Sequence, residues 1–215
     1  MDDDAIAFQD LVDRSLYLVN RGDFDCVGGI YYEYYEGEKP KWYDMTNHTY
    51  NGNEKSLVIC KYNIPIGCIV LYKKKCLLKV GLFLPTLGMK GNKIGYGEET
   101  EVQKRMFDAG YKIGFDPGLK IWHYVPDIKM TMKWQIKSYF VEGRDNVYKY
   151  SNAEILFNII KAFGSCILKA IPRNSYKILF NKKYYWQNLI LDTLKPVIRC
   201  AGIVYGKITS ETYIT

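Results

Sequence analysis

The sequence predicts an α/β fold that is followed by a helical tail. Segments of strand character alternate with segments of helical periodicity over residues 1–150, which is typical of helices packed on a sheet. A chain of 215 residues is long enough to bury such a core. Residues 151–215 then become strongly apolar with helical character, so we expect two parts with a boundary near residue 150.

Helical periodicity and terminal signals locate the first helices. Apolar residues recur at helical spacing over residues 5–20, and the aspartates before them would lie favourably at the positive end of a helix. Residues 98–109 contain good helix formers and stop at Gly110, and residues 74–80 stop in the same way at Gly81. A further helix is predicted over residues 130–150.

Four short segments have strand character: residues 26–31, 66–72, 112–115 and 119–124. An Asp-Pro-Gly sequence at residues 116–118 separates the last two and predicts a turn between them. The adjacent glycines Gly28 and Gly29 indicate a close approach of backbone or ligand. Residues 33–53 and the glycine-rich residues 82–97 are predicted to be loops.

Composition limits the kinds of partner. The net charge of +7 favours an anionic partner such as a nucleotide diphosphate, a phospholipid headgroup or a nucleic acid. The 20 tyrosines, nine phenylalanines and four tryptophans supply flat faces that suit sugar rings or a membrane interface, although ordinary packing also uses them. The basic residues are scattered and form no recognition motif, so we expect no nucleic-acid partner.

Cysteine usage and the first residues indicate an intracellular location. The six cysteines include no Cys-x-x-Cys pair, which argues against a zinc ribbon or a redox motif and predicts buried thiols. Three aspartates follow Met1, whereas a signal peptide needs a basic and then an apolar segment. We therefore expect the protein to face the cytoplasm.

The C-terminal part is apolar but interrupted. Residues 155–171 carry Lys161 and Lys169, so they fall short of a typical membrane-spanning helix. Pro172 and Pro196 are expected to break the tail into pieces, and residues 182–186 combine two lysines with three interfacial aromatic residues. These features predict two helices lying in the plane of a membrane surface; a helical hairpin packed on the first domain is the alternative.

Three groups of side chains suit metal binding or proton transfer. Asp2 and Asp4 offer oxygens of the kind that hold a divalent ion with substrate phosphates, although an acidic terminus is often simply solvated. Glu98 and Glu99 follow a glycine at a predicted helix start, where one could accept a proton from a bound hydroxyl or both could simply stabilise the helix. His123, at a strand end, is a candidate metal ligand, proton carrier or core histidine.

The order of these segments is more specific than any one of them. Along the chain come MDDDA, DCVGGIYYEYYEGEKPKWY, KVGLFLPTLGMKGNKIGYGEETEVQKRMFDAGYKIGFDPGLKIWHYVP and MTMKWQIKSYFVEGR. This ordered set covers about residues 2–144 and resembles family-two glycosyltransferases of the GT-A fold, especially those that build bacterial and archaeal cell-surface polysaccharides. The resemblance implies a partial GT-A fold with a mixed sheet. It also implies an inverting, metal-dependent transfer from a nucleotide-sugar donor to a glycan or lipid-linked acceptor at the cytoplasmic face of the membrane.

The resemblance further implies roles for single residues. Asp2 and Asp4 would form the Asp-x-Asp element that holds Mn²⁺ or Mg²⁺ on the donor diphosphate, and His123 would complete this metal site. Glu99 would take the proton from the acceptor hydroxyl, with Glu98 supporting substrate placement. The implied substrate-binding positions are Gly28, Gly29, Trp42 and Gly97.

Two departures from the family pattern bear on these expectations. Many relatives have Gly-Ala-Asn where this chain has Gly67-Cys68-Ile69, and an Asp-Pro where this chain has Leu84-Pro85, which leaves the substrate preference open. In this family the base-binding strands precede the Asp-x-Asp element, whereas this chain starts at that element. We therefore expect an N-terminally truncated transferase with little or no activity alone; an inactive remnant or a membrane-associated carbohydrate-binding module is the alternative.

Overall fold

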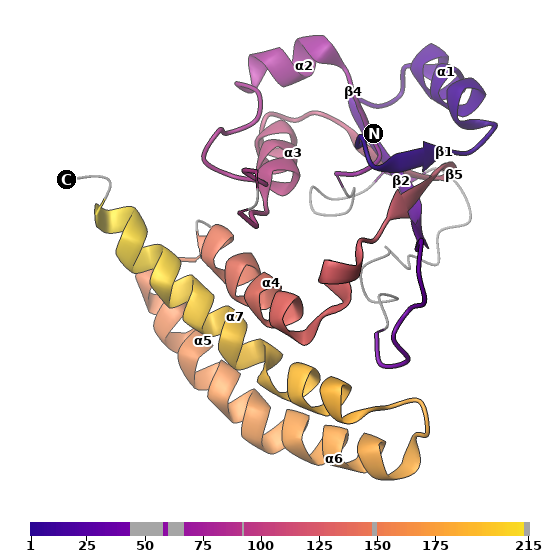
Figure 1. The fold of residues 1–215 in the computed structure, drawn as a ribbon. Coiled ribbons are helices and arrows are strands. Elements are labelled where there is room, and N and C mark those ends of the chain that lie inside the picture. Colours follow the sequence, from indigo (N-terminus) through magenta and orange to yellow (C-terminus); the bar gives the residue numbers. More distant parts are fainter. Residues whose placement is uncertain (44–57, 60–66, 92, 148–149, 213–215) are drawn as a thin grey trace. The chain divides into compact units, whose positions relative to one another are not determined.

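The computed structural model describes residues 1–43, 58–59, 67–91, 93–147 and 150–212. The chain forms two compact units. The first contains Met1–Glu38, Asp44–Thr86 and Glu98–Pro126, and the second contains Lys39–Tyr43, Leu87–Gly97 and Asp127–Thr215. A sheet with short helices makes up the first unit, and long helices dominate the second (Figure 1). The predicted α/β class is confirmed at this level.

Within the described residues, the sheet of the first unit is mixed and has five strands. Its order is β1 (Ala5–Ala7), β5 (Ile113–Tyr124), β2 (Cys26–Tyr34) and β4 (Val70–Tyr72), and β3 (Val58–Ile59) pairs with the first part of β5. Strands β2 and β5 run parallel, whereas β1, β3 and β4 are antiparallel to their neighbours. The last residues of β5 therefore lie beside β1, near the start of the chain.

Helices cover this sheet through two clusters of buried residues. Helix α1 (Leu11–Arg21) places Leu18 in a core that includes Val27 of β2 and Leu119 of β5. Helices α2 (Lys74–Lys79) and α3 (Glu98–Asp108) contribute to a second core through Cys76 and Met106. The predicted helices over residues 74–80 and 98–109 are thus confirmed.

The described cysteines agree with the prediction of buried thiols. All five are buried and unbridged: Cys26, Cys68, Cys76, Cys166 and Cys200. Cys60 lies outside the described residues.

The helix predicted over residues 5–20 is wrong in its first part. Ala5–Ala7 pairs with the end of β5 instead, and the helix begins only at Leu11. Over Ala5–Ala7, main-chain pairing along the edge of β5 outweighs the apolar periodicity. The same periodicity correctly predicts a helix over the residues of α1. As a result the aspartates at residues 2–4 precede a strand and do not cap a helix.

The two strands predicted over residues 112–124 form one strand with an irregularity. Phe115 pairs with Gly28, whereas Lys120 pairs with Ile30, so β5 contains additional residues at the predicted turn. A Cβ atom on Gly29 would lie 2.0 Å from a carbonyl oxygen of β5. The close backbone approach that the glycine pair predicted therefore occurs at this bulge.

The remaining strand and loop predictions are partly confirmed. The strand predicted over residues 66–72 is shorter, because residues 67–69 form a turn before β4 and residue 66 lies outside the described part. In the loop predicted over residues 33–53, the first two residues belong to β2 and residues 44–53 are outside the described part. Residues 82–97 form a loop wherever they are described.

The second unit is built from helices. After a 3-10 turn at Asp127–Met130, α4 (Met132–Asp145) ends earlier than the predicted 130–150. A continuous helical run follows, consisting of α5 (Asn152–Ser165), a π-helical segment (Cys166–Ala170) and α6 (Ile171–Phe180), and then α7 (Trp186–Thr212). Helices α5 and α7 lie side by side (Figure 1).

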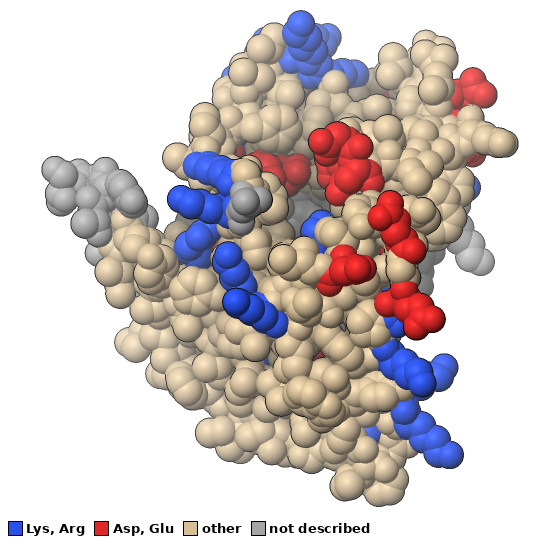
Figure 2. Space-filling model, viewed as in Figure 1, with Lys and Arg blue, Asp and Glu red and all other residues tan. Residues whose placement is uncertain are grey.

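Helices α4 and α7 pack with their backbones in contact. A Cβ atom on Gly202 would lie 2.0 Å from the carbonyl oxygen of Phe140, and one on Gly143 would lie 2.0 Å from that of Arg199. Glycines on both helices thus permit an approach that any larger residue would prevent. Figure 2 shows a broad surface with few charged side chains where Figure 1 places α6 and the adjoining parts of α5 and α7.

The expectation that prolines break the tail is wrong at both positions. Pro172 follows the π-helical segment, whose wider turn gives room to a ring that would otherwise clash with the carbonyl group four residues earlier. Pro196 lies within α7, which is buried on either side of it at Leu191 and Cys200. This burial offsets the cost of about 3 kcal/mol of a proline inside a helix.

Candidate metal and acid–base site

The first residues of the chain are held against two other segments. The main-chain N–H of Asp2 donates to the carbonyl oxygen of Cys68 at 3.3 Å. Three residues later, Ala5 is paired with His123 across β1 and β5. Because Asp4 directly precedes this pair, the side chains of residues 2 and 4 are brought beside the imidazole of residue 123.

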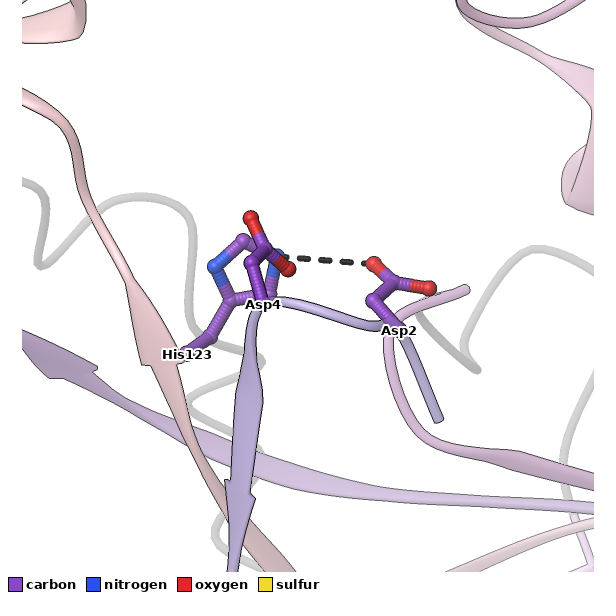
Figure 3. Close-up of side chains that lie close together, drawn as sticks. All are labelled: Asp2, Asp4 and His123. Atoms are coloured by element: carbon purple, nitrogen blue, oxygen red, sulfur yellow. Dashed lines mark ion pairs between the residues drawn. The ribbon is translucent and has the colours of Figure 1, made fainter.

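These three side chains converge on one point (Figure 3). The Nε2 atom of His123 lies 3.5 Å from Oδ2 of Asp2 and 3.6 Å from Oδ1 of Asp4. One ligand atom from each residue falls within 4.8 Å of the others. Donor atoms of a single ion, each bound at about 2.1 Å, lie roughly 3–4 Å apart. Small rotations of the two exposed aspartates are therefore enough to place all three donors on one ion.

The orientation of His123 suits a metal ligand. Its Nδ1 atom lies 2.9 Å from the carbonyl oxygen of Tyr124. A carbonyl group only accepts hydrogen bonds, so Nδ1 carries the proton, and a neutral ring then directs the lone pair of Nε2 toward the carboxylates. The ring of Tyr31 packs 5.7 Å from the imidazole and restricts its position. If the imidazole is protonated, the same geometry forms ion pairs with the two aspartates.

Glu99 lies in the first turn of α3 and packs tightly against a glycine. A Cβ atom on Gly67 would lie 2.0 Å from Oε1 of Glu99. Burial raises the pKa of Glu99 to about 7, and the negative charges of Glu98 and Asp2 contribute to the rise. Close to neutral pH this carboxyl group is about half ionised, which is the state that suits a general base.

The turn at residues 67–69 connects Glu99 to the metal-binding candidates. Burial raises the pKa of the Cys68 thiol to about 12, and the charges of Asp2 and Glu99 both add to this rise. The main chain of Asp2 bonds to Cys68 and the side chain of Glu99 packs on Gly67, so both residues lie beside this turn. Gly67 and Cys68 were not among the site residues predicted from the sequence; their only signal was the departure from the Gly-Ala-Asn pattern of the resembling family.

Seven of the nine predicted site residues lie in the first unit: Asp2, Asp4, Gly28, Gly29, Glu98, Glu99 and His123. Gly28 and Gly29 lie in β2 of this unit, where the close approach to β5 accounts for Gly29. Trp42 and Gly97 belong to the second unit, in which the carbonyl oxygen of Trp42 accepts a 2.6 Å hydrogen bond from Asn188 of α7. Their part in substrate binding stays a prediction.

An aromatic cluster on the sheet was likewise not predicted from the sequence. The ring of Trp122 stacks on Phe8 with centroids 5.3 Å apart, and Tyr32 lies 5.3 Å from the same indole. Trp122 and Tyr32 remain 39% and 40% exposed. The alternation of residues along β2 and β5 was the available signal, because paired positions on parallel strands share a face of the sheet.

Comparison with models of known protein families and with curated protein sequences gave no match for this chain.

Proposed function

We propose that this chain carries the metal-binding and acceptor-side residues of an inverting glycosyltransferase of the GT-A type. The reaction would move a sugar from a nucleotide-sugar donor to a glycan or lipid-linked acceptor. The observation that carries this proposal is the convergence of Asp2, Asp4 and His123 near Glu99, whose pKa is about 7. The ordered motifs that resemble family-two glycosyltransferases support the same assignment.

The donor set fits a divalent cation. Two carboxylate oxygens suit Mg²⁺ and Mn²⁺, and the imidazole nitrogen adds a ligand that Mn²⁺ accepts more readily. When bound, such an ion supplies positive charge that stabilises the departing nucleotide diphosphate. Asp2 and Asp4 hold the charge of the site, and the carbonyl group of Tyr124 keeps His123 turned toward it.

Glu99 supplies the acid–base part of the proposal. Its carboxylate takes the proton of the acceptor hydroxyl while the hydroxyl oxygen forms a bond to the anomeric carbon and the bond from that carbon to the diphosphate oxygen breaks. One displacement of this kind inverts the anomeric centre without a covalent intermediate. A pKa of about 7 gives the carboxylate a higher proton affinity than an exposed glutamate has.

The metal site is tested by titrating Mn²⁺ into the chain in a calorimeter. The double substitution Asp2→Asn with Asp4→Asn is expected to lower the affinity at least about tenfold, because it removes both charged ligands. Asp3→Asn is the matched control: it changes the charge of the same exposed segment but lies outside the converging group. Equal weakening by the control would show that the segment attracts cations only through its overall charge.

Catalysis is tested by the release of nucleoside diphosphate from a panel of nucleotide sugars with Mn²⁺. Because base-binding strands precede the Asp-x-Asp element in the resembling family, the assay uses both this chain and its reading frame extended upstream. Glu99→Gln is expected to lower turnover about 100-fold or more while Mn²⁺ affinity is kept. Asp108→Asn, at the exposed end of the same helix, should leave both unchanged. Full activity of Glu99→Gln would refute the assignment of the base.

A carbohydrate-binding module is the second candidate function. The partly exposed aromatic rings of Trp122 and Tyr32 favour it, because aromatic rings stack on sugars without a metal or a nucleotide. This function predicts glycan binding that persists in a chelator and is lost in Trp122→Ala. Glycan binding that requires Mn²⁺ and a nucleoside diphosphate would favour the transferase.

A further inference from the structure

One flank of the helical run over residues 152–180 is packed against α7. Its buried residues recur along a single stripe: Ile155, Ala162, Cys166, Ala170 and Asn174. The thiol of Cys166 donates to the carbonyl oxygen of Thr193 at 3.3 Å, and the side-chain amide of Asn174 donates to the hydroxyl of Thr193 at 3.0 Å. The polar side chains of Cys166 and Asn174 therefore have partners within the protein. These hydrogen bonds to α7 fix which flank of the helical run faces that helix.

Another flank exposes large apolar side chains. Six residues of α5 and the π-helical segment are between 52% and 77% exposed: Leu156, Phe157, Ile160, Phe163, Ile167 and Leu168. In α6, Leu179 and Phe180 extend this set with 75% and 70% exposure. We call these eight residues the apolar flank. Scattered exposed apolar residues are ordinary, but a contiguous set on one helix marks a surface that contacts another apolar phase.

Basic residues accompany the apolar flank. Lys161, Lys169, Arg173 and Lys177 are separated by eight, four and four residues, so they follow one line along the helix. Glu154 is the one acidic residue in the sequence between positions 152 and 180. At the end of the run come Lys182 and Lys183, followed by Trp186, which is 57% exposed. An apolar stripe beside cations and an interfacial tryptophan is the pattern of a helix that lies on an anionic lipid surface.

We propose that the apolar flank inserts into the surface of a bilayer that contains anionic lipids, with the helical run lying in the plane of the membrane. A second copy of the same face fits less well, because it would bring the basic lines of two copies together without acidic partners. The proposal rests on the second unit alone and is independent of the metal site and of Glu99.

An in-plane position explains the distribution of charge better than a membrane span. Among the described residues, Ala153–Phe180 is long and apolar enough to cross a bilayer, and only 22% of its most apolar stretch is buried, unlike the core helix of a soluble protein. A span, however, would carry both Lys161 and Lys169 into the hydrocarbon region of the bilayer. In the plane, the same lysines reach the headgroups while the apolar flank enters the acyl region.

Flotation of the purified full chain with vesicles tests the surface. Binding is expected to vesicles of phosphatidylcholine with one quarter phosphatidylglycerol, and more weakly to phosphatidylcholine alone. Ile160→Gln with Leu168→Gln should lower the partition coefficient about tenfold, since both side chains leave the acyl region. The matched control is Leu16→Gln with Val19→Gln, which changes two exposed apolar residues of α1 in the first unit. Equal loss in the control, or equal binding by all three proteins, would overturn the proposal.

Two further measurements test the lipid charge and the orientation. Lys169→Gln with Arg173→Gln should reduce the preference for anionic vesicles, whereas Lys74→Gln with Lys75→Gln, on exposed positions of α2, should keep it. An in-plane helix is expected to be released from the vesicles by alkaline carbonate. Retention after the carbonate wash would show a membrane span and refute the in-plane position. Circular dichroism of each variant checks that the helices are intact.

Discussion

Replacing Glu99 by Gln is expected to make the protein more stable at high pH while it removes the proposed base. Burial, with help from neighbouring carboxylates, raises the pKa of Glu99 from 4.5 to about 7. The folded chain therefore disfavours the ionised form. A difference of about 2.5 (7 minus 4.5), at about 1.4 kcal/mol for each pH unit, corresponds to roughly 3 kcal/mol.

The sign and the pH window follow from proton binding. Because the folded state holds this proton more tightly than the unfolded state, the stability of the unmodified chain falls as the pH rises from 4.5 to about 7. Glutamine has no charge to bury, so the variant escapes this loss. The free energy of unfolding of Glu99→Gln should exceed that of the unmodified chain by less than about 1 kcal/mol at pH 5 and by roughly 3 kcal/mol at pH 8.

Urea unfolding followed by circular dichroism at pH 5 and pH 8 measures this difference. Asp108→Asn serves as the control on the same helix: it removes an exposed ion pair with Lys104 that is worth about 0.3–0.5 kcal/mol, and its effect should not grow between the two pH values. A Glu99→Gln variant that is equally stable to the unmodified chain at pH 8 would refute both the burial of this carboxyl group and its suitability as a base.

Four other substitutions test the packing inside each of the two units. Gly29→Ala should lower the free energy of unfolding in urea by roughly 2–4 kcal/mol, because its Cβ would lie 2.0 Å from a carbonyl oxygen of β5. Gly164→Ala should instead stabilise the helix by about 0.5–1 kcal/mol, because nothing lies within 4 Å of the added atom. Equal effects of the two would contradict the close approach at the β5 bulge. Gly202→Ala should lower the thermal stability of the second unit, since the added atom would lie 2.0 Å from a main-chain oxygen of α4; an unchanged melting temperature would show that the two helices are farther apart. Arg14→Met should lower the free energy of unfolding by about 2–4 kcal/mol. The fully buried carboxylate of Asp116 would lose the two hydrogen bonds, of 2.6 and 2.9 Å, that it accepts from the guanidinium. A loss below about 1 kcal/mol would show that this carboxylate is in contact with water.

The helices that the sequence predicts correctly are those whose ends depend on local signals. Glycine stops end α2 and α3 close to the predicted residues, and acidic residues at the first turn of α3 favour the start of that helix whatever surrounds it. The sequence also named Asp2, Asp4, His123 and Glu99 as candidates, because the chemistry that they suit depends on residue type and order; their roles stay predictions.

Only the tertiary structure decided how these residues meet. Ala5 became part of a strand because β5 offered its edge, and this pairing places Asp4 beside His123 although the two are far apart in the sequence. The pKa of Glu99 was likewise beyond the reach of the sequence, because it depends on the burial of the side chain against Gly67.

The tail shows the same division between local pattern and packing. Composition alone determined that residues 155–171 are apolar and carry two lysines, Lys161 and Lys169. Whether Pro172 and Pro196 would end helices depended on a π-helical turn and on burial against neighbouring helices, which are properties of the packed unit. Local free energies of a few kcal/mol set the preferences of each segment, but contacts between distant segments are of the same size and decide which preference is realised.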